Sequence, residues 1–439
     1  MRRLLSYVPV LAALTLGSTP AFAQTDRDAL IKEGRYVAAA SDCVACHTAP
    51  GRPAYSGGIA FTLPIGTIYS TNITPDPDHG IGKYSEADFA RAIRQGIRPD
   101  GSTLYPAMPF PSYARLTDHD IHALYAYFHD AVKAEPLAAP ENKVSWPLSM
   151  RFPLTLWRWA FAPAPSAARN TTLHQFSDPT LTRGAYLVEG PGHCGACHSP
   201  RGISMQESGL TAADGSSFLS GGAAIDGWVP PSLRQENRTG LGRWNEDDIV
   251  LFLKTGRNRQ GESFGGMSDA IKHGTQHLSE GDLHAMAKYL LALKPADTKQ
   301  ADWVYNTQTA SSLHKADFSE RGAKIYIDNC AACHRTDGKG YAAVFPPLAG
   351  NPVLMGKDPA SLVHIIQSGA TLPGMEAAPS AITMPDFRNR LTDQQVADVV
   401  TFIRHAWGNN APAISQEDVV ALKKTMPERN LSNEAVPLN

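Results

Sequence analysis

The pattern Cys-x-x-Cys-His occurs three times in this chain. The copies are Cys43-Val44-Ala45-Cys46-His47, Cys194-Gly195-Ala196-Cys197-His198 and Cys330-Ala331-Ala332-Cys333-His334. In a helical turn, positions i, i+3 and i+4 lie on one face, so the two thiols and the imidazole of each copy can reach the same flat group. The pattern is the attachment signature of haem c, whose vinyl groups bond to the thiols and whose iron binds the imidazole. The sequence therefore predicts three covalent haems c.

All six cysteines of the chain lie in these motifs, which leaves none for a disulfide or a catalytic thiol. A single Cys-x-x-Cys-His could instead be half of a zinc site or a redox dithiol. A zinc site takes four ligands, usually from two clusters close in sequence, whereas these motifs lie more than 130 residues apart. The spacing therefore favours haem over zinc.

The first 23 residues have the pattern of a cleaved signal peptide. Arg2 and Arg3 precede an apolar core over residues 4–16, and Ala21-Phe22-Ala23 is a small-x-small cleavage site. The mature chain is then expected to begin at Gln24 and to be exported. The alternative is a retained membrane anchor, but the apolar stretch is shorter than the ~20 residues of a span.

No later segment is long and apolar enough to predict a transmembrane helix, and the net charge of −2 does not suggest a nucleic-acid partner.

The haem motifs lie inside a longer repeat. Upstream of each is a short helical segment that contains Gly and Tyr, around Gly34, Gly184 and Gly322. Downstream of each is a helix with a Thr or Ser N-cap and an acidic or amide residue three positions later, as in a capping box. Apolar residues then recur at helical spacing, and an aromatic residue falls ten positions after each cap. The caps are Thr117, Ser279 and Thr392, and the aromatic residues are Tyr127, Tyr289 and Phe402.

A third helix is expected between these landmarks in each copy, over residues 85–95, 245–255 and 358–368. Each ends at a glycine suited to a helix C-cap. The chain is therefore predicted to be all-α, with three tandem class I-like cytochrome c domains. These domains cover residues 24–135, 179–296 and 318–410. They are joined by an aromatic, Pro-rich linker (136–178) and a second linker (297–317), and followed by a polar tail (411–439).

A six-coordinate haem iron needs a second axial ligand in each domain besides His47, His198 and His334, and methionine fills this role in electron-transfer cytochromes. Met108 and Met267 are the candidates in the first two domains. In the third, Met384 lies 8 residues before its helix cap, close to the 9 between Met108-Pro109 and Thr117, whereas Met375 is out of register. The predicted axial pairs are therefore His47 with Met108, His198 with Met267 and His334 with Met384. The alternative is that these methionines only fill the core.

Each haem-ligating histidine should donate its other ring N–H to a backbone carbonyl, which fixes the tautomer. The carbonyl is expected from a loop at 71–73 in the first domain, 230–233 in the second and 346–348 in the third.

Several stretches resemble one known family. They are residues 64–75, 103–109, 190–198, 240–244 and 264–267, and the likeness extends over nearly the whole mature chain. The chain resembles the triheme cytochrome c subunit of bacterial membrane-bound dehydrogenases, such as the alcohol, gluconate, sorbitol and fructose enzymes. The tail after residue 410 is the part that departs from the resemblance.

The resemblance implies an electron-transfer role at the periplasmic face of the cytoplasmic membrane. A large partner subunit that contains pyrroloquinoline quinone or FAD would oxidise the alcohol, sugar or sugar acid, and a small third subunit can accompany it. Electrons would pass through the three haems to ubiquinone. In this interpretation the present chain carries out no bond chemistry on the substrate and has no catalytic residues of its own.

Membrane contact is expected to be peripheral, through residues 146–161, which contain three Trp, two Phe and two Arg. The alternative is that this segment straps two domains together or faces the large subunit. Two other functions stay open. The chain could be a stand-alone periplasmic electron carrier or a multihaem peroxidase, although a peroxidase needs an open or labile sixth position on one iron.

Overall fold

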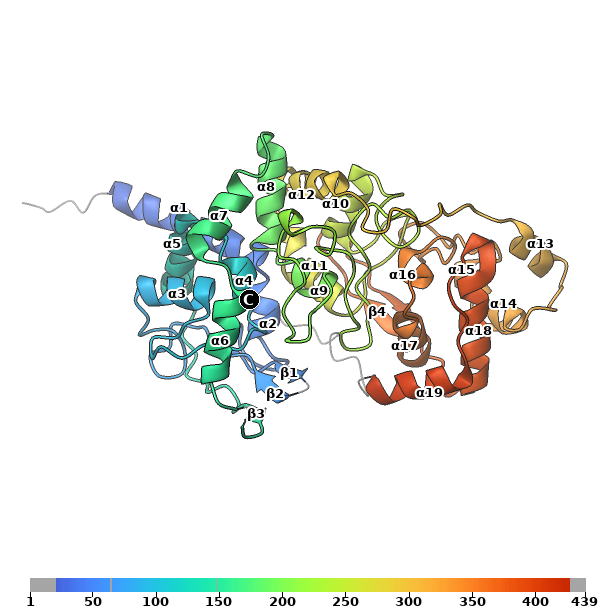
Figure 1. Cartoon of the computed structure of the whole chain (residues 1–439), viewed down its shortest axis with the longest axis horizontal. Helices are drawn as coiled ribbons and strands as arrows, with labels where there is room; N and C mark the ends of the chain where they lie inside the picture. The colour runs from blue at the N-terminus through green and yellow to red at the C-terminus, as the bar shows by residue number, and fades with distance from the viewer. Residues whose placement is uncertain (1–20, 64, 148, 427–439) are drawn as a thin grey trace, which may run out of the picture.

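The computed structural model describes residues 21–63, 65–147 and 149–426, and the protein is mostly helical (Figure 1). The predicted signal peptide, up to residue 20, and the end of the predicted tail lie outside the described residues. Among the described residues, none of the helices combines the length and the apolar character that a membrane span requires.

The first repeat begins with a long helix and ends with a helix that continues into a π-helical turn. Its elements are α1 (Ala21–Ala40), α2 (Cys43–His47), β1 (Ala60–Leu63), β2 (Gly66–Tyr69), α3 (Glu86–Gln95), α4 (Phe110–Tyr113), α5 (Asp118–Ala126) and η1 (Tyr127–Ala131). The linker that follows contains β3 (Lys143–Val144), α6 (Phe152–Phe161) and α7 (Pro165–Leu173). Because β3 pairs with β2, and β2 with β1, the linker returns to the first repeat as the edge of a three-stranded antiparallel sheet.

The second and third repeats have the same order of helices around their motifs. The second contains α8 (Pro179–Glu189), α9 (Gly195–His198), η2 (Ala212–Asp214), α10 (Glu246–Thr255), α11 (Gly266–His273), η3 (Thr275–His277) and α12 (Glu280–Ala292). After α13 (Gln308–His314), the third contains α14 (Ala323–Asn329), α15 (Ala331–His334), α16 (Pro352–Met355), α17 (Ala360–Ser368), β4 (Ala370–Leu372), β5 (Ile382–Met384), α18 (Asp393–His405) and η4 (Ala406–Gly408). The protein is thus not purely helical, because small sheets accompany the first and third repeats.

The expected helix caps are confirmed. Thr117, Ser279 and Thr392 each accept a backbone N–H three residues later. In every repeat the first helix meets the last at a glycine. A Cβ on Gly184 would lie 2.0 Å from the Ala285 carbonyl oxygen, and the same approach occurs at Gly34 and Gly322. The aromatic residue ten positions after each cap is buried beside this crossing.

The hydrophobic core of the described residues forms two large clusters and one small one. The first two repeats share one continuous cluster, which contains Phe128 and Tyr289, whereas the third has a separate cluster around Trp407. Figure 1 shows α14–α19 gathered at one end of the molecule. A small third cluster of Ile271, Leu372 and Met375 joins the second repeat to the third.

The predicted polar tail contains a helix, α19 (Gln416–Thr425), which packs against α17 and α18. Ser415 and Asp418 form a capping box at its start, and Val419 is fully buried. This part of the tail therefore belongs to the folded third repeat.

Candidate functional site: three haem-attachment turns

Each Cys-x-x-Cys-His motif lies on a short helical turn that follows the first helix of its repeat. The imidazole Nδ1 of His47 lies 2.6 Å from the Thr71 carbonyl oxygen. Nδ1 of His198 lies 2.8 Å from the Pro231 carbonyl oxygen, and Nδ1 of His334 lies 3.0 Å from the Pro346 carbonyl oxygen. The expected carbonyl partners are confirmed in all three repeats. Because Nδ1–H donates to the carbonyl, Nε2 is left as the nitrogen that can bind iron.

The ionisation of these side chains fits haem attachment. Burial lowers the pKa of His47, His198 and His334, which favours the neutral imidazole that ligates a metal. Burial raises the pKa of the Cys46, Cys194 and Cys330 thiols to about 12. A reactive dithiol has a lowered thiol pKa instead. The six cysteines are not joined in disulfides, so both thiols of each turn are free to form thioethers.

The predicted methionine ligands are all half-buried at the edges of the cores. Met108 lies in a turn directly before α4, and its backbone N–H donates to the Tyr105 carbonyl. Met267 is the second residue of α11, and it contacts two of the hydrophobic clusters. Met384 ends β5, where it pairs with Ala370. Met375, the rejected candidate, is fully packed against Ile271 and Leu372, in the small cluster between the second and third repeats.

The first two attachment turns lie close enough for the Cys46 and Cys197 thiols to interact electrostatically. The turn α2 packs against α11, the helix that bears Met267. Asp42 directly precedes the first motif, and burial together with the charge of Asp269 on α11 raises its pKa. Burial likewise raises the pKa of Asp269 to about 7. Burial therefore favours the uncharged form of both groups beside this pair of turns.

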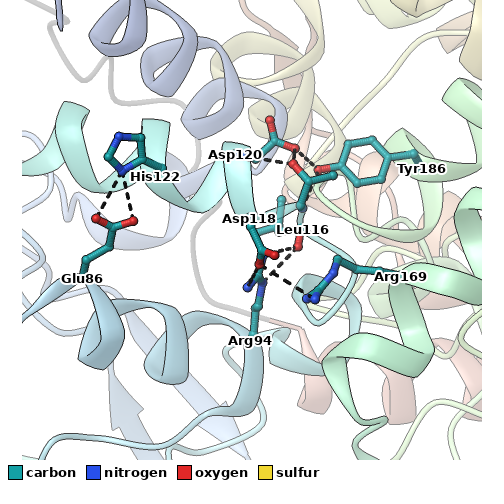
Figure 2. Close-up of polar contacts among 9 residues, drawn as sticks. Glu86, Arg94, Leu116, Asp118, Asp120, His122, Arg169 and Tyr186 are labelled. Carbon is teal, nitrogen blue, oxygen red and sulfur yellow. Dashed lines mark hydrogen bonds and ion pairs between the residues drawn. The ribbon is translucent and has the colours of Figure 1, made fainter.

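A tyrosine of each of the first two repeats donates a hydrogen bond to an aspartate of the other repeat. This tyrosine exchange is a feature that sequence reasoning missed. Tyr186 of α8 donates its hydroxyl hydrogen to Asp120 at the start of α5 (Figure 2). Tyr36 of α1 donates to Asp282 at the start of α12, over 2.6 Å. Each tyrosine is two residues after the crossing glycine of its own repeat, and each aspartate is three residues after the N-cap of the other repeat. The two repeats are therefore joined by a pseudo-symmetric pair of contacts.

Polar side-chain contacts around this exchange follow the same symmetry in part. Figure 2 shows His122 beside Glu86, at 3.0 Å, and the equivalent pair in the second repeat is His284 with Glu246, at 2.6 Å. Figure 2 also shows Asp118 between Arg94 of α3 and Arg169 of the linker helix α7.

The third repeat lacks the exchange because its residues differ at both positions. Lys324 replaces the tyrosine and pairs with Asp328 in the same helix. Gln395 replaces the aspartate and closes the capping box of Thr392. The first two repeats thus form one unit, and the third is attached to it by other contacts.

Comparisons with known proteins agree with these observations. The sequence model of the cytochrome c family matches residues 31–131 and 319–407. The chain is 53% identical over 420 residues to the cytochrome c subunit of the quinone alcohol dehydrogenase of Gluconacetobacter polyoxogenes. The alignment covers 94% of this chain and 89% of the relative. It is 51% identical over 418 residues to the gluconate 2-dehydrogenase cytochrome c subunit of Pantoea cypripedii, with 94% of both chains covered. The fructose dehydrogenase cytochrome subunit of Gluconobacter japonicus is 35% identical over 430 residues, with 93% and 86% covered.

Proposed function

This chain belongs to the family of cytochrome c subunits of quinone-linked dehydrogenases, and on that basis we propose that it passes electrons through three covalent haems c to ubiquinone. The observation that carries the proposal is the threefold occurrence of one geometry. In each repeat a Cys-x-x-Cys-His turn holds its histidine by Nδ1 on a loop carbonyl. Haem c supplies a one-electron couple when it is bound.

The residues of the chain would attach the haems and ligate their iron. In this proposal the six motif cysteines form the thioethers, Nε2 of His47, His198 and His334 binds iron on one side, and Met108, Met267 and Met384 bind it on the other. Thioether ligation raises the potential and closes the sixth position. The packing of Met375 in the cluster with Ile271 supports the choice of Met384 in the third repeat.

The partner is proposed to be a large periplasmic dehydrogenase subunit with pyrroloquinoline quinone or FAD, together with a small third subunit. The named relatives are subunits of alcohol, gluconate and fructose dehydrogenases. Cleavage after Ala23 would deliver the mature chain to the periplasmic face of the cytoplasmic membrane.

Isolation of the complex tests this function. A tagged full-length chain should co-purify with a dehydrogenase subunit. Ethanol, gluconate or fructose should reduce its haems, and added ubiquinone should reoxidise them. Isolation of the chain alone would favour a stand-alone carrier. Reoxidation by hydrogen peroxide but not by ubiquinone would favour a peroxidase.

The helix α6 is the proposed contact with the membrane surface. Phe152, Leu156 and Trp159 lie on one helical face and are 64%, 60% and 84% exposed. Trp157 faces the body of the protein, where its indole N–H donates to the Ser204 carbonyl over 2.8 Å and its ring packs on Phe110. Trp157 thus holds the helix in place, while the outer face is free to enter an interface.

Replacing Phe152, Leu156 and Trp159 together with serine should release the chain from lipid vesicles. We expect vesicle partitioning to fall about 100-fold or more, because each such side chain contributes about 1.5–3 kcal/mol when it is buried. Co-sedimentation with vesicles measures this. Val304→Ser, at a residue that is 73% exposed in the second linker, is the control. If the triple variant still binds vesicles but no longer binds the dehydrogenase subunit, α6 is a subunit interface instead.

A further inference from the structure

A stack of three rings crosses the contact between the second and third repeats. The indole of Trp228 stacks on both the Phe264 ring and the His364 ring. The ring centroids are 4.7 Å apart for Trp228 and His364, with planes inclined by 22°, and 5.8 Å apart for Trp228 and Phe264, inclined by 18°. Phe264 and Trp228 belong to the second repeat, whereas His364 lies on α17 of the third.

Neighbouring backbone holds these rings in place. A Cβ on Gly227 would lie 2.0 Å from Nδ1 of His364, and a Cβ on Gly265 would lie 2.4 Å from Cδ1 of Trp228. Both glycines also have positive φ, which disfavours any side chain there. Across the contact, Ser361 of α17 accepts the Val229 N–H at 2.7 Å. The stack is therefore part of a closely fitted seam.

His364 is buried at a cost that its position in the fold does not explain. It is fully buried, and among the described residues neither ring nitrogen meets full hydrogen-bond geometry, although the Gly227 backbone lies beside the ring. A buried polar group with incomplete hydrogen bonds costs about 1–3 kcal/mol. A buried polar group of this kind calls for a functional explanation.

Both ends of the stack lead toward haem-attachment sites. Trp228 is three residues before Pro231, whose carbonyl accepts the Nδ1–H of His198. Phe264 is three residues before Met267, which is the ligand proposed for the other side of the same haem. In the third repeat, Val363 and Ile366 on α17 pack in the cluster that contacts Met384 and Cys330.

We propose that Trp228 and His364 form the contact through which electrons cross between the haem sites of the second and third repeats. This inference rests on the proposed function. A single electron moves from one site to the other by tunnelling. Neither ring is oxidised and no proton is transferred. The rings of Trp228 and His364 stack across the seam with centroids 4.7 Å apart, and electron tunnelling is faster through bonded and packed atoms than through empty space.

The test compares two tryptophans at the same seam. Trp303 lies in the second linker against Arg243 and Gly350, away from the ring stack. Full-length chains with Trp228→Leu, Trp228→Phe and Trp303→Leu are compared with the parent. Pulse radiolysis injects electrons, transient absorbance follows their redistribution among the haems, and spectroelectrochemistry gives the haem potentials. Protection of the 297–317 linker from protease reports docking of the third repeat.

We expect Trp228→Leu to slow one redistribution phase about tenfold, with haem potentials and linker protection unchanged. Trp228→Phe and Trp303→Leu should remain close to the parent. An unchanged rate in Trp228→Leu would overturn the proposal. Equal slowing in Trp303→Leu would also overturn the proposal, as would shifted haem potentials or lost linker protection in Trp228→Leu. Each of these results would assign Trp228 to docking of the third repeat alone. If Trp228→Leu fails to load haem, the variant His364→Leu tests the same contact from α17. Loss of the proposed function itself would appear separately, as a parent chain without three haems or without haem-to-haem transfer.

Discussion

Replacing Gly184 with alanine is expected to lower the free energy of unfolding by about 3 kcal/mol, at the upper end of the usual cost of overpacking. The added Cβ would lie 2.0 Å from the Ala285 oxygen and 2.7 Å from Cβ of Tyr289. Both atoms belong to α12, so α8 and α12 would have to move apart in a core that the first two repeats share. Urea unfolding followed by helical circular dichroism measures the change.

The matched control is Gly281→Ala, in α12 itself. Only Ser279 Oγ, at 4.0 Å, lies near the new Cβ. Alanine is the better helix former, so this variant should gain about 0.4–1 kcal/mol. Equal losses of stability in the two variants would contradict the crossing of first and last helices at Gly184.

Removing the proposed axial methionines should change the electrochemistry without unfolding the chain. Met108→Ala, Met267→Ala and Met384→Ala should each lower one haem potential by on the order of 0.1 V, within the ~0.8 V range that axial ligands span. Thioether ligation favours ferrous iron, so its loss favours the ferric state. Redox titration measures the potentials, and the Met–iron charge-transfer absorbance should fall by one haem in each variant.

Met375→Ala distinguishes a ligand from a core residue. Met375 is buried with Ile271 and Leu372, so its loss should cost about 2–5 kcal/mol of stability and leave every potential unchanged. If this variant lost a Met-ligated haem while Met384→Ala did not, the assignment in the third repeat would have to be reversed.

Local signals in the sequence were sufficient to predict the repeated helices and the histidine partners. Helix caps, apolar spacing and the Cys-x-x-Cys-His turns act over a few residues, and the loop carbonyls at Thr71, Pro231 and Pro346 follow from each motif's own repeat. The helix α19 also had a local signal, since Ser415 and Asp418 match a capping box.

Contacts between repeats could not be predicted in the same way. Asp120 and Asp282 match capping boxes in the sequence, as Gln395 does, yet their carboxylates accept from tyrosines of the other repeat. Which residue approaches a helix start from outside depends on how whole repeats pack. For the same reason, the sequence did not reveal the stack of Trp228 on His364, or that Trp157 faces inward while Trp159 faces outward.

The central claim is that this chain carries three covalent haems, and the intact mass of the exported protein tests it most directly. The account predicts a chain that begins at Gln24 and bears three haems, with one haem lost from each variant in which both cysteines of a motif are replaced by serine. A mass that corresponds to two haems, or to zinc in place of iron, would contradict it.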